Sequence, residues 1–397
     1  METRQDHVRR AQRPCASAIF FKIYDSGADS IIMSSSRLKS WGTSAIVTIA
    51  LGSISGVGAA PRKVIGSRLW IERAMDLVRA HKPTPPASAR FYAYVASVYA
   101  DARKVAGPVQ ASEATHRLID AFYPEDGEAT ARAAAKIAAP VKLGAPTKNI
   151  LDGYLNRFRT DRFKPDDPAQ DMLVAPVGEG YWQRRTNKGP FAPSAGSWQR
   201  WIVPEGTAFV VAPPPQIGTP EYQQQVQIVL EAVARRDAIW QAKINFWAGA
   251  PGTEAPGGIW LNRLWTITSV ESLGSNDAQY ARTQKILAET IADAFMECWK
   301  IKYTYWTARP DMVIPNLSLG MDDPPFPGNV SGHSTVSAAA ATILGKLVPA
   351  HASLWMTDAE TARDTRLYAG IHFTVDNESG FDLGGQIGRL VNSISVS

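Results

Sequence analysis

The stretch that decides the fold is VSGHSTVSAAAATILGKL, residues 330–347. From Ser334 to Leu347 its residues are mainly apolar or small, which predicts a buried helix, and the run Ala338–Ala341 indicates close packing against neighbouring helices. Ser331 and the amide of Gly332 open this helix. Its first turn therefore offers free backbone N–H groups and the positive end of the helix dipole, both of which favour a bound anion.

Helical patterning accounts for most of the remaining chain. Between residues 63 and 160, apolar positions recur at helical spacing and prolines separate successive amphipathic segments. The same patterning returns at Glu221–Ala248 and most clearly at Asp277–Tyr305. Strand patterns are scarce and no internal repeat is found. We predict an all-α fold, a pair of packed helix bundles that form a single catalytic domain over residues 61–397.

Residues 165–220 differ in composition from the helical segments. Glycine, proline and tryptophan are frequent here, and the helical period fades between Gly178 and the prolines Pro213–Pro215. Loops of this length in a compact domain are often functional. We predict ordered loops that cover the helical body and surround the mouth of a pocket.

The composition excludes some classes of protein. The net charge of the 397 residues is +5, of which residues 1–60 contribute +3, and no run of lysine and arginine appears. This distribution predicts no nucleic-acid partner. The 12 tryptophans indicate a large aromatic core or aromatic pocket walls.

The first 60 residues are predicted to be a leader. Arg37 and Lys39 precede an apolar stretch from Trp41 to Val57, which runs into the small residues Gly58–Ala60. This is the pattern of a secretory signal peptide, and it predicts that translation starts at Met33. An amphipathic anchor or a disordered arm is the alternative.

Export has two consequences for the mature protein. Cleavage near Ala60 would remove Cys15 and leave Cys298 alone, so no intramolecular disulfide could form. No apolar run of about 20 residues follows residue 60, so the mature part is predicted not to span a membrane. The sequence therefore predicts a periplasmic or secreted protein.

Three spaced clusters in the last quarter of the chain predict a site for a tetrahedral oxyanion. The clusters are Lys302 with Arg309-Pro310, then Ser331-Gly332-His333, then Thr365-Arg366 followed by Gly370, His372 and Asp376. Guanidinium groups match the oxygens of phosphate-like anions, and a lysine adds a fixed positive charge. Two histidines can supply a proton donor or acceptor and a nucleophile or ligand.

This arrangement resembles the signature shared by vanadium-dependent haloperoxidases, bacterial class A acid phosphatases and type 2 phosphatidic acid phosphatases. It departs from the family pattern at Val330, where proline is usual, and at Thr365, where serine is usual. Outside the signature, the likeness leans toward the haloperoxidases and extends over most of residues 63–397. Near the first cluster, this likeness rests on Asp293-Ala294, which precede Trp299-Lys300 and Trp306. Further upstream, it rests on Gly180-Tyr181-Trp182, Pro213–Pro215 and Phe246-Trp247.

The resemblance implies an all-α haloperoxidase or phosphatase fold and an anion cradle. Lys302, Arg309 and Arg366 would hold the equatorial oxygens of vanadate or phosphate. Ser331 and the amide of Gly332 would complete the cradle. Vanadate is the implied cofactor, and because vanadium(V) acts as a Lewis acid, no haem is implied.

The resemblance also assigns the reactive groups. His372 would be the axial ligand of vanadium or, in a phosphatase, the nucleophile, and His333 would be the general acid–base. Asp376 follows His372 by four residues, so on a helix it would share a face with His372 and orient the ring. In the haloperoxidases, vanadate binds hydrogen peroxide, the lysine (here Lys302) polarises the peroxide oxygen, and halide attacks to give hypohalous acid.

Three nearby residues have two interpretations each. Trp299 and Phe326 match the halide-pocket aromatics of chloroperoxidases, whereas algal bromoperoxidases tend to carry histidine at the second place; packing in the core is the alternative. The preference for chloride or bromide stays open. Asp293 either pairs with an active-site arginine or forms a salt bridge on the helix surface.

Three functions follow from the sequence. The first is a vanadate-dependent haloperoxidase acting on hydrogen peroxide and halide. The second is an acid phosphatase that cleaves a phosphate ester through a phosphohistidine at His372. The third is a non-enzymatic oxyanion-binding protein, against which the paired histidines argue. The sequence leaves the oligomeric state open, a homo-oligomer included.

Overall fold

The computed structural model describes residues 66–161, 163, 174–185 and 189–395, and the backbone of residues 20–23 and 31–34. The chain divides into two compact units, Met1–Ala60 and Pro61–Ser397. In the first unit, strand β1 (Phe20–Ile23) pairs antiparallel with strand β2 (Ile31–Ser34). Apart from residues 33 and 34, the predicted signal peptide lies outside the described residues, as does Cys15.

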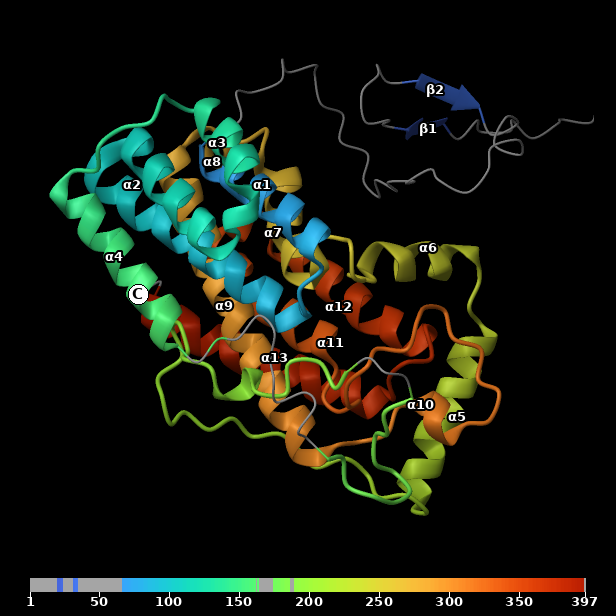
Figure 1. The fold of residues 1–397 in the computed structure, drawn as a ribbon. Coiled ribbons are helices and arrows are strands. Elements are labelled where there is room, and N and C mark those ends of the chain that lie inside the picture. The colour runs from blue at the N-terminus through green and yellow to red at the C-terminus, as the bar shows by residue number, and fades with distance from the viewer. Residues whose placement is uncertain are drawn as a thin grey trace, which may run out of the picture. The chain divides into compact units, whose positions relative to one another are not determined.

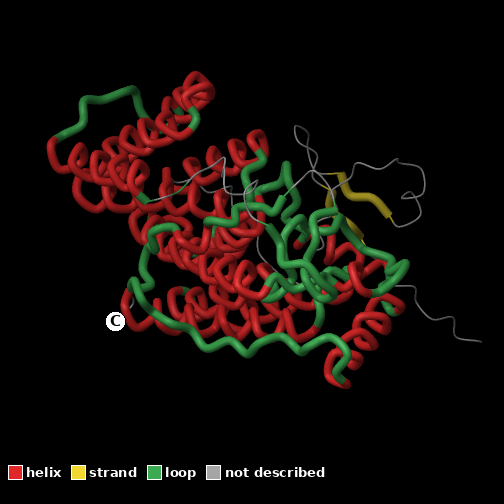
Figure 2. Tube along the Cα trace, turned by 60° about the horizontal axis from the view of Figure 1, so that its bottom comes forward, coloured by secondary structure: helices red, strands yellow, loops and turns green. Residues whose placement is uncertain are grey.

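The second unit is helical (Figures 1 and 2). Its α-helices are α1 (Gly66–His81), α2 (Pro85–Phe122), α3 (Gly127–Ala135), α4 (Ala145–Thr160), α5 (Pro220–Ala234), α6 (Ala238–Trp247), α7 (Ala255–Thr268), α8 (Ser272–Ser275), α9 (Asp277–Tyr305), α10 (Pro310–Val313), α11 (Gly332–Leu347), α12 (Ala352–Tyr368) and α13 (Thr374–Ser395). Short 3₁₀ turns occur at η2 (Pro124–Asp126), η4 (Ala195–Ser197) and η5 (Pro349–His351). Every regular element described between residues 66 and 395 is a helix, which confirms the predicted all-α fold.

The helix boundaries follow local sequence signals. Helix α9 has the predicted bounds: the side chain of Asn276 accepts a hydrogen bond from the Gln279 N–H at its start, and Trp306 ends it in the left-handed region at φ 54°. The predicted segment Glu221–Ala248 is two helices, because Asp237 interrupts it and caps α6 by accepting from the Trp240 N–H. None of the helices that the structure describes is long and apolar enough to cross a bilayer.

Two groups of helices share α9. In the N-terminal group, α2 packs along α9 and is flanked by α1 and α4. In the C-terminal group, α11 packs against α9, α12 and α13, and it lies at the centre of the unit in Figure 1. The buried apolar side chains of both groups form one continuous core.

A row of glycines on α13 sets its distance from α11. Gly380, Gly384 and Gly388 are spaced by four residues, so they lie on one face of the helix. A Cβ atom at Gly384 would lie 2.1 Å from the carbonyl oxygen of Thr335, and one at Gly380 would lie 2.7 Å from that of Ser331. The expected close packing at Ala338–Ala341 is present, since these alanines are buried. This contact brings the first turns of α11 and α13 together.

Replacing Gly384 with alanine should therefore separate the two helices or strain them. We expect Gly384→Ala to lower the free energy of unfolding by about 1–3 kcal/mol, the usual cost of overpacking. Gly153→Ala is the matched control, because a Cβ atom at this exposed glycine in α4 would have no other atom within 4 Å. The control should gain up to about 1 kcal/mol from helix propensity. Equal urea midpoints for the two variants would contradict the packing argument.

Candidate active site

The three sequence clusters meet where four helices begin or end. Lys302 lies in the last turn of α9, Ser331 caps the start of α11, and Arg366 lies in the last turn of α12. The remaining residues, Arg309, His372 and Asp376, come from the segment after α9 and from the junction of α12 with α13. The Ser331 N–H donates to the carbonyl of Asp376 at 2.9 Å, so the second and third clusters are joined directly.

The structure buries the three cations of the site completely. The side chains of Lys302, Arg309 and Arg366 have 0% exposure. Lys302 Nζ donates to the carbonyls of Pro327 and Gly328 at 2.7 and 2.6 Å. Burial, with a smaller contribution from Arg309, lowers the pKa of Lys302 to about 7, although Cys298 and Asp376 oppose the shift. A bound anion would reverse that shift, because negative charge favours the ammonium form.

Two of the three guanidinium nitrogens of Arg309 donate hydrogen bonds to backbone carbonyls, and the third does not. Its Nε donates to the carbonyl of Phe326 at 2.9 Å, and its Nη1 donates to the carbonyl of Ile371 at 2.8 Å. The third nitrogen, Nη2, is buried and has no hydrogen-bond partner among the described residues. Such a donor needs an acceptor to offset the cost of its burial.

Arg366 is oriented by the residue that precedes it. The hydroxyl of Thr365 accepts from Nε and Nη2 of Arg366 at 3.1 and 2.9 Å, and Nη1 contacts the sulfur of Met321 at 3.1 Å. The threonine thus supplies the hydroxyl that serine usually supplies at this position. Burial, followed by repulsion from Arg309, lowers the pKa of Arg366.

His372 and Asp376 form a hydrogen-bonded pair. Asp376 Oδ2 lies 3.1 Å from His372 Nδ1 and also accepts from the Phe373 N–H at 3.1 Å. Contrary to expectation, His372 does not share a helix with Asp376, because α13 begins at Thr374. The carboxylate instead reaches back from the first turn of α13 to the preceding loop. This contact orients the ring with its Nε2 3.3 Å from Arg309 Nη1.

Both histidines are held in the neutral form at neutral pH. Burial lowers the pKa of His372 well below its ordinary value, and Arg309 and Lys302 add to the shift. Burial also lowers the pKa of His333, with Arg366 as the next cause. His333 Nε2 is buried and has no hydrogen-bond partner in the described part of the chain.

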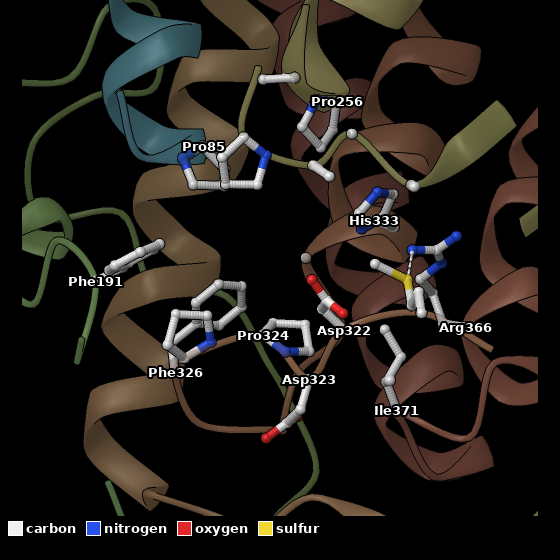
Figure 3. A pocket seen from close by; sticks show the side chains of 18 of the residues that line it. Pro85, Phe191, Pro256, Asp322, Asp323, Pro324, Phe326, His333, Arg366 and Ile371 are labelled. Carbon is white, nitrogen blue, oxygen red and sulfur yellow. Dashed lines mark hydrogen bonds between the residues drawn. The ribbon is translucent and has the colours of Figure 1, made fainter. Parts of the chain in front are cut away.

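A cavity of about 470 Å³ is lined by some of the site residues (Figure 3). His333, Arg366 and His372 line it, as do both predicted halide-pocket residues. Trp299 and Phe326 lie with their ring centroids 4.9 Å apart, and Trp299 is almost fully buried at 1% exposure. The Nζ of Lys302 lies 5.2 Å from the ring centroid of Phe326. These aromatics therefore pack in the core and face the cavity at the same time.

The predicted loops also reach this cavity. Trp182, Gln183, Arg185 and Phe191 belong to the loop region 165–220 and line the cavity wall. The part of that region that the structure describes contains the turn η4 as its one regular element before α5 begins at Pro220. The expectation of loops around a pocket mouth is confirmed for these residues.

Sequence reasoning missed an acidic neighbour of Arg309. Asp323 Oδ1 lies 3.5 Å from Arg309 Nε, and burial raises the pKa of Asp323 to about 6. Asp322 and Asp323 both line the cavity (Figure 3). The available signal was the acidic pair before Pro324-Pro325, between the first and second clusters.

Neither interpretation of Asp293 was right. Its carboxylate is fully buried and accepts three backbone hydrogen bonds, from the N–H groups of residues 201–203, at 2.7–2.9 Å. It contacts no active-site arginine and is not on the surface. Asp293 instead anchors the long loop to α9, because a buried carboxylate is stabilised by several N–H donors.

The charge balance of the site fits a tetrahedral oxyanion. Three buried cations face two nearby carboxylates, and burial raises the pKa of both Asp376 and Asp323 to about 6. Uncompensated buried charge is strongly unfavourable unless a counter-ion is bound. The unpartnered donor of Arg309, the first-turn N–H groups of α11 and the histidine rings supply what such an anion needs.

Comparison with known protein families matches the segment that contains the candidate site. Residues 285–396, which hold all three clusters, match the PAP2 superfamily. No curated protein matches the chain in sequence.

Two solved structures share the fold of the PAP2 segment and of the helices before it. A bacterial vanadium-dependent iodoperoxidase is 17% identical, with a TM-score of 0.70 over 85% of this chain and 98% of its own. The apo form of a bacterial vanadium-dependent chloroperoxidase is 13% identical, with a TM-score of 0.64 over 81% of this chain and 97% of its own. At these identities the likeness shows the fold, which is the all-α fold of those enzymes.

Anion binding at this site should depend on pH. We expect the affinity for sulfate, which keeps its charge throughout, to fall as pH rises from about 6 to about 9, because Lys302 must take up a proton to hold the anion. As pH rises through about 6, ionisation of Asp323 and Asp376 adds negative charge beside the site and also lowers the affinity for sulfate. Calorimetry in two buffers of different ionisation enthalpy would measure the proton uptake directly.

Lys302→Met is the informative variant for this test. It should bind sulfate more weakly and lose most of the pH dependence above about pH 7, where the carboxylates are already ionised. Sulfate affinity that is flat with pH in the unaltered protein would show that Lys302 is not the group that gains the proton.

Proposed function

We propose that this protein is a vanadate-dependent haloperoxidase, which oxidises halide with hydrogen peroxide to hypohalous acid. The observation that carries the proposal is a set of three buried cations beside a cavity with aromatic residues in its wall. Arg366 lines the cavity, and Lys302 and Arg309 lie 5.2 and 5.0 Å from the ring centroid of Phe326, which also lines it. The cations fit a tetrahedral oxyanion. The aromatic walls suit a small, weakly hydrated halide better than the charged head of a phosphate ester.

The residues present fit vanadate. Lys302, Arg309 and Arg366 would bind its oxygens, with Ser331 and the Gly332 amide completing the cradle, and His372 would ligate the metal. When bound, vanadate supplies a Lewis acid that activates hydrogen peroxide toward halide. Lys302 would add positive charge beside the bound anion.

The side chains of the site would deliver the proton that the reaction consumes. Halide, hydrogen peroxide and one proton give hypohalous acid and water, so a proton must reach a leaving oxygen. His333 lines the cavity, and its buried Nε2 has no hydrogen-bond partner among the described residues. A nearby anion would raise the lowered pKa of the ring toward neutrality. Asp376 would hold His372 in the tautomer with the proton on Nδ1, which leaves Nε2 free as a ligand.

The halide would bind at the aromatic wall of the cavity. Trp299 and Phe326 face the cavity beside Lys302, whose ammonium lies within 6 Å of both ring centroids. A cation next to apolar rings offers attraction without strong competing hydration. We propose these two residues as the halide pocket.

An acid phosphatase is the second candidate, because the same cradle fits phosphate. In that case His372 Nε2, held 3.3 Å from Arg309, would attack phosphorus and His333 would protonate the leaving oxygen. In either case we propose export to the periplasm or the medium, on the sequence pattern of residues 33–60 alone.

One protein preparation assayed in two ways decides between the candidates. We expect halogenation of a reporter dye with peroxide and bromide, only after orthovanadate is added, and little hydrolysis of a phosphomonoester in the vanadate-free sample. Hydrolysis without any halogenation would overturn the haloperoxidase assignment in favour of the phosphatase.

His372→Ala tests the site itself. It should lower either activity by roughly 100-fold or more, since it removes the metal ligand or the nucleophile. His351→Ala is the matched control, because this half-buried histidine pairs with Glu271 away from the cavity and should keep full activity. Undiminished turnover by His372→Ala would mean that the reactive groups lie elsewhere.

A further inference from the structure

We propose that Met321 is a site of oxidative modification, at which hypohalous acid converts the thioether to a sulfoxide and thereby weakens the binding of the anion by Arg366. The source of the oxidant rests on the proposed function, whereas the reactivity of Met321 and its effect on the cradle do not. Met321 belongs to none of the three sequence clusters. It is half-buried, lines the cavity and lies directly before the acidic pair Asp322-Asp323.

The sulfur of Met321 lies at the guanidinium nitrogen of Arg366 that is left for an anion. Nε and Nη2 of Arg366 already donate to the hydroxyl of Thr365 at 3.1 and 2.9 Å. Nη1 has the sulfur, at 3.1 Å, as its one polar contact among the described residues, and Figure 3 draws this contact as a dashed line beside Arg366. A thioether is a weak hydrogen-bond acceptor, so an oxyanion can displace it at little cost. The unmodified methionine therefore leaves this donor available.

The elements around Met321 hold its sulfur in this position. The N–H of Gly320 donates to the carbonyl of Ala369 at 2.9 Å, and the carbonyl of Gly320 accepts from Gln241 of α6 at 2.8 Å. The Met321 side chain packs against the small buried cluster that includes Ala369. These contacts place the sulfur beside Arg366 and in the lining of the cavity.

A second contact between a sulfur and a guanidinium gives an internal comparison. Arg90 Nη1 lies 3.4 Å from the sulfur of Met296, but Met296 is 2% exposed and is not part of the cavity lining. That sulfur packs in the core, out of reach of a dissolved oxidant. Met321 differs because its side chain lines the cavity and contacts a cation of the cradle. The two methionines are therefore alike in chemistry and different in access.

The oxidation balances with hypohalous acid as the oxidant. The sulfur attacks the halogen, so a sulfur–halogen bond forms and the oxygen–halogen bond breaks with loss of hydroxide. The hydroxide then adds to the sulfur, halide leaves, and one proton is released. The sulfur loses two electrons and the halogen gains them. The product is methionine sulfoxide, which is polar where the thioether was apolar.

The sulfoxide changes the hydrogen bonding of the cradle. Its oxygen carries partial negative charge and accepts hydrogen bonds more strongly than the sulfur does. Because the sulfur lies 3.1 Å from Arg366 Nη1, the added oxygen would take up the N–H that the anion needs. Excess hypohalous acid would thereby lower the anion affinity of the site, which amounts to negative feedback on the proposed reaction.

The first measurement adds limiting hypobromite to the vanadate-free protein and locates sulfoxides by peptide mass spectrometry. We expect Met321 to be oxidised while Met296 stays reduced, because access to the cavity distinguishes them. Met356, which is half-buried in α12 and outside the cavity lining, is the reference for general reactivity. A Met321 that stays reduced at hypobromite levels that oxidise Met356 overturns the modification site.

The second measurement is sulfate affinity by calorimetry, before and after the same treatment. We expect the unaltered protein to lose about tenfold in affinity, roughly the loss of one charge-assisted hydrogen bond. Met321→Leu forms no sulfoxide and should keep the affinity that it has before treatment. Met312→Leu removes another methionine of the cavity lining and should lose affinity as the unaltered protein does. Equal losses in the two variants, or no loss in the unaltered protein, overturn the effect on the cradle.

Met321→Gln tests the same effect without any oxidant. Its side-chain amide places a neutral oxygen acceptor near Arg366, as the sulfoxide does, so its sulfate affinity should be lower from the start than that of Met321→Leu. Equal sulfate affinity in the glutamine and leucine variants would contradict competition for the Arg366 N–H. This comparison stands even where hypobromite damages other side chains.

Turnover separates this proposal from the proposed function. With vanadate, peroxide and bromide, the ratio of sulfoxide at Met321 to sulfoxide at Met356 should exceed the ratio given by added hypobromite, because the oxidant forms in the cavity. A halogenating enzyme with the same ratio as the added reagent overturns oxidation from within the cavity. A protein that never halogenates, yet loses sulfate affinity when hypobromite oxidises Met321, overturns the haloperoxidase function and supports the modification site.

Discussion

The burial of three cations with too little negative charge beside them is the constraint on which this structure depends. Lys302, Arg309 and Arg366 are fully removed from solvent, and burial raises the pKa of the two neighbouring carboxylates. Such an arrangement is costly in the absence of a counter-ion. The fold tolerates it because backbone carbonyls and the Thr365 hydroxyl hold most of the N–H groups. The remaining donors and the start of α11 then define a place for an anion.

The scaffold holds these charges together by close helix packing. The first turns of α11 and α13 touch because glycines on α13 let its backbone approach the carbonyls of α11. That contact joins Ser331 to Asp376, and Asp376 orients His372. A small change in helix separation would therefore alter the alignment of the cradle with the histidine. Stability and site geometry depend on the same interface.

The cradle and the cavity carry different information about function. A cradle of lysine, arginines and a helix N-terminus fits any tetrahedral oxyanion, so it suits vanadate and phosphate equally. The cavity is more selective, because its lining combines aromatic rings and prolines with charged groups such as Asp322, Asp323 and Arg366. The proposed peroxidase function depends on those walls.

The sequence by itself determined the helical class and the bounds of α9, and it predicted the residues of an oxyanion site, because helical periodicity and motif spacing are local properties. It did not reveal the role of Asp293, the ion pair of Asp323 with Arg309, or the loop position of His372. Each of these depends on contacts between segments far apart in the chain, which no local pattern records. The cavity is likewise a product of tertiary structure, since its walls come from the ends of helices and from loops that only packing brings together.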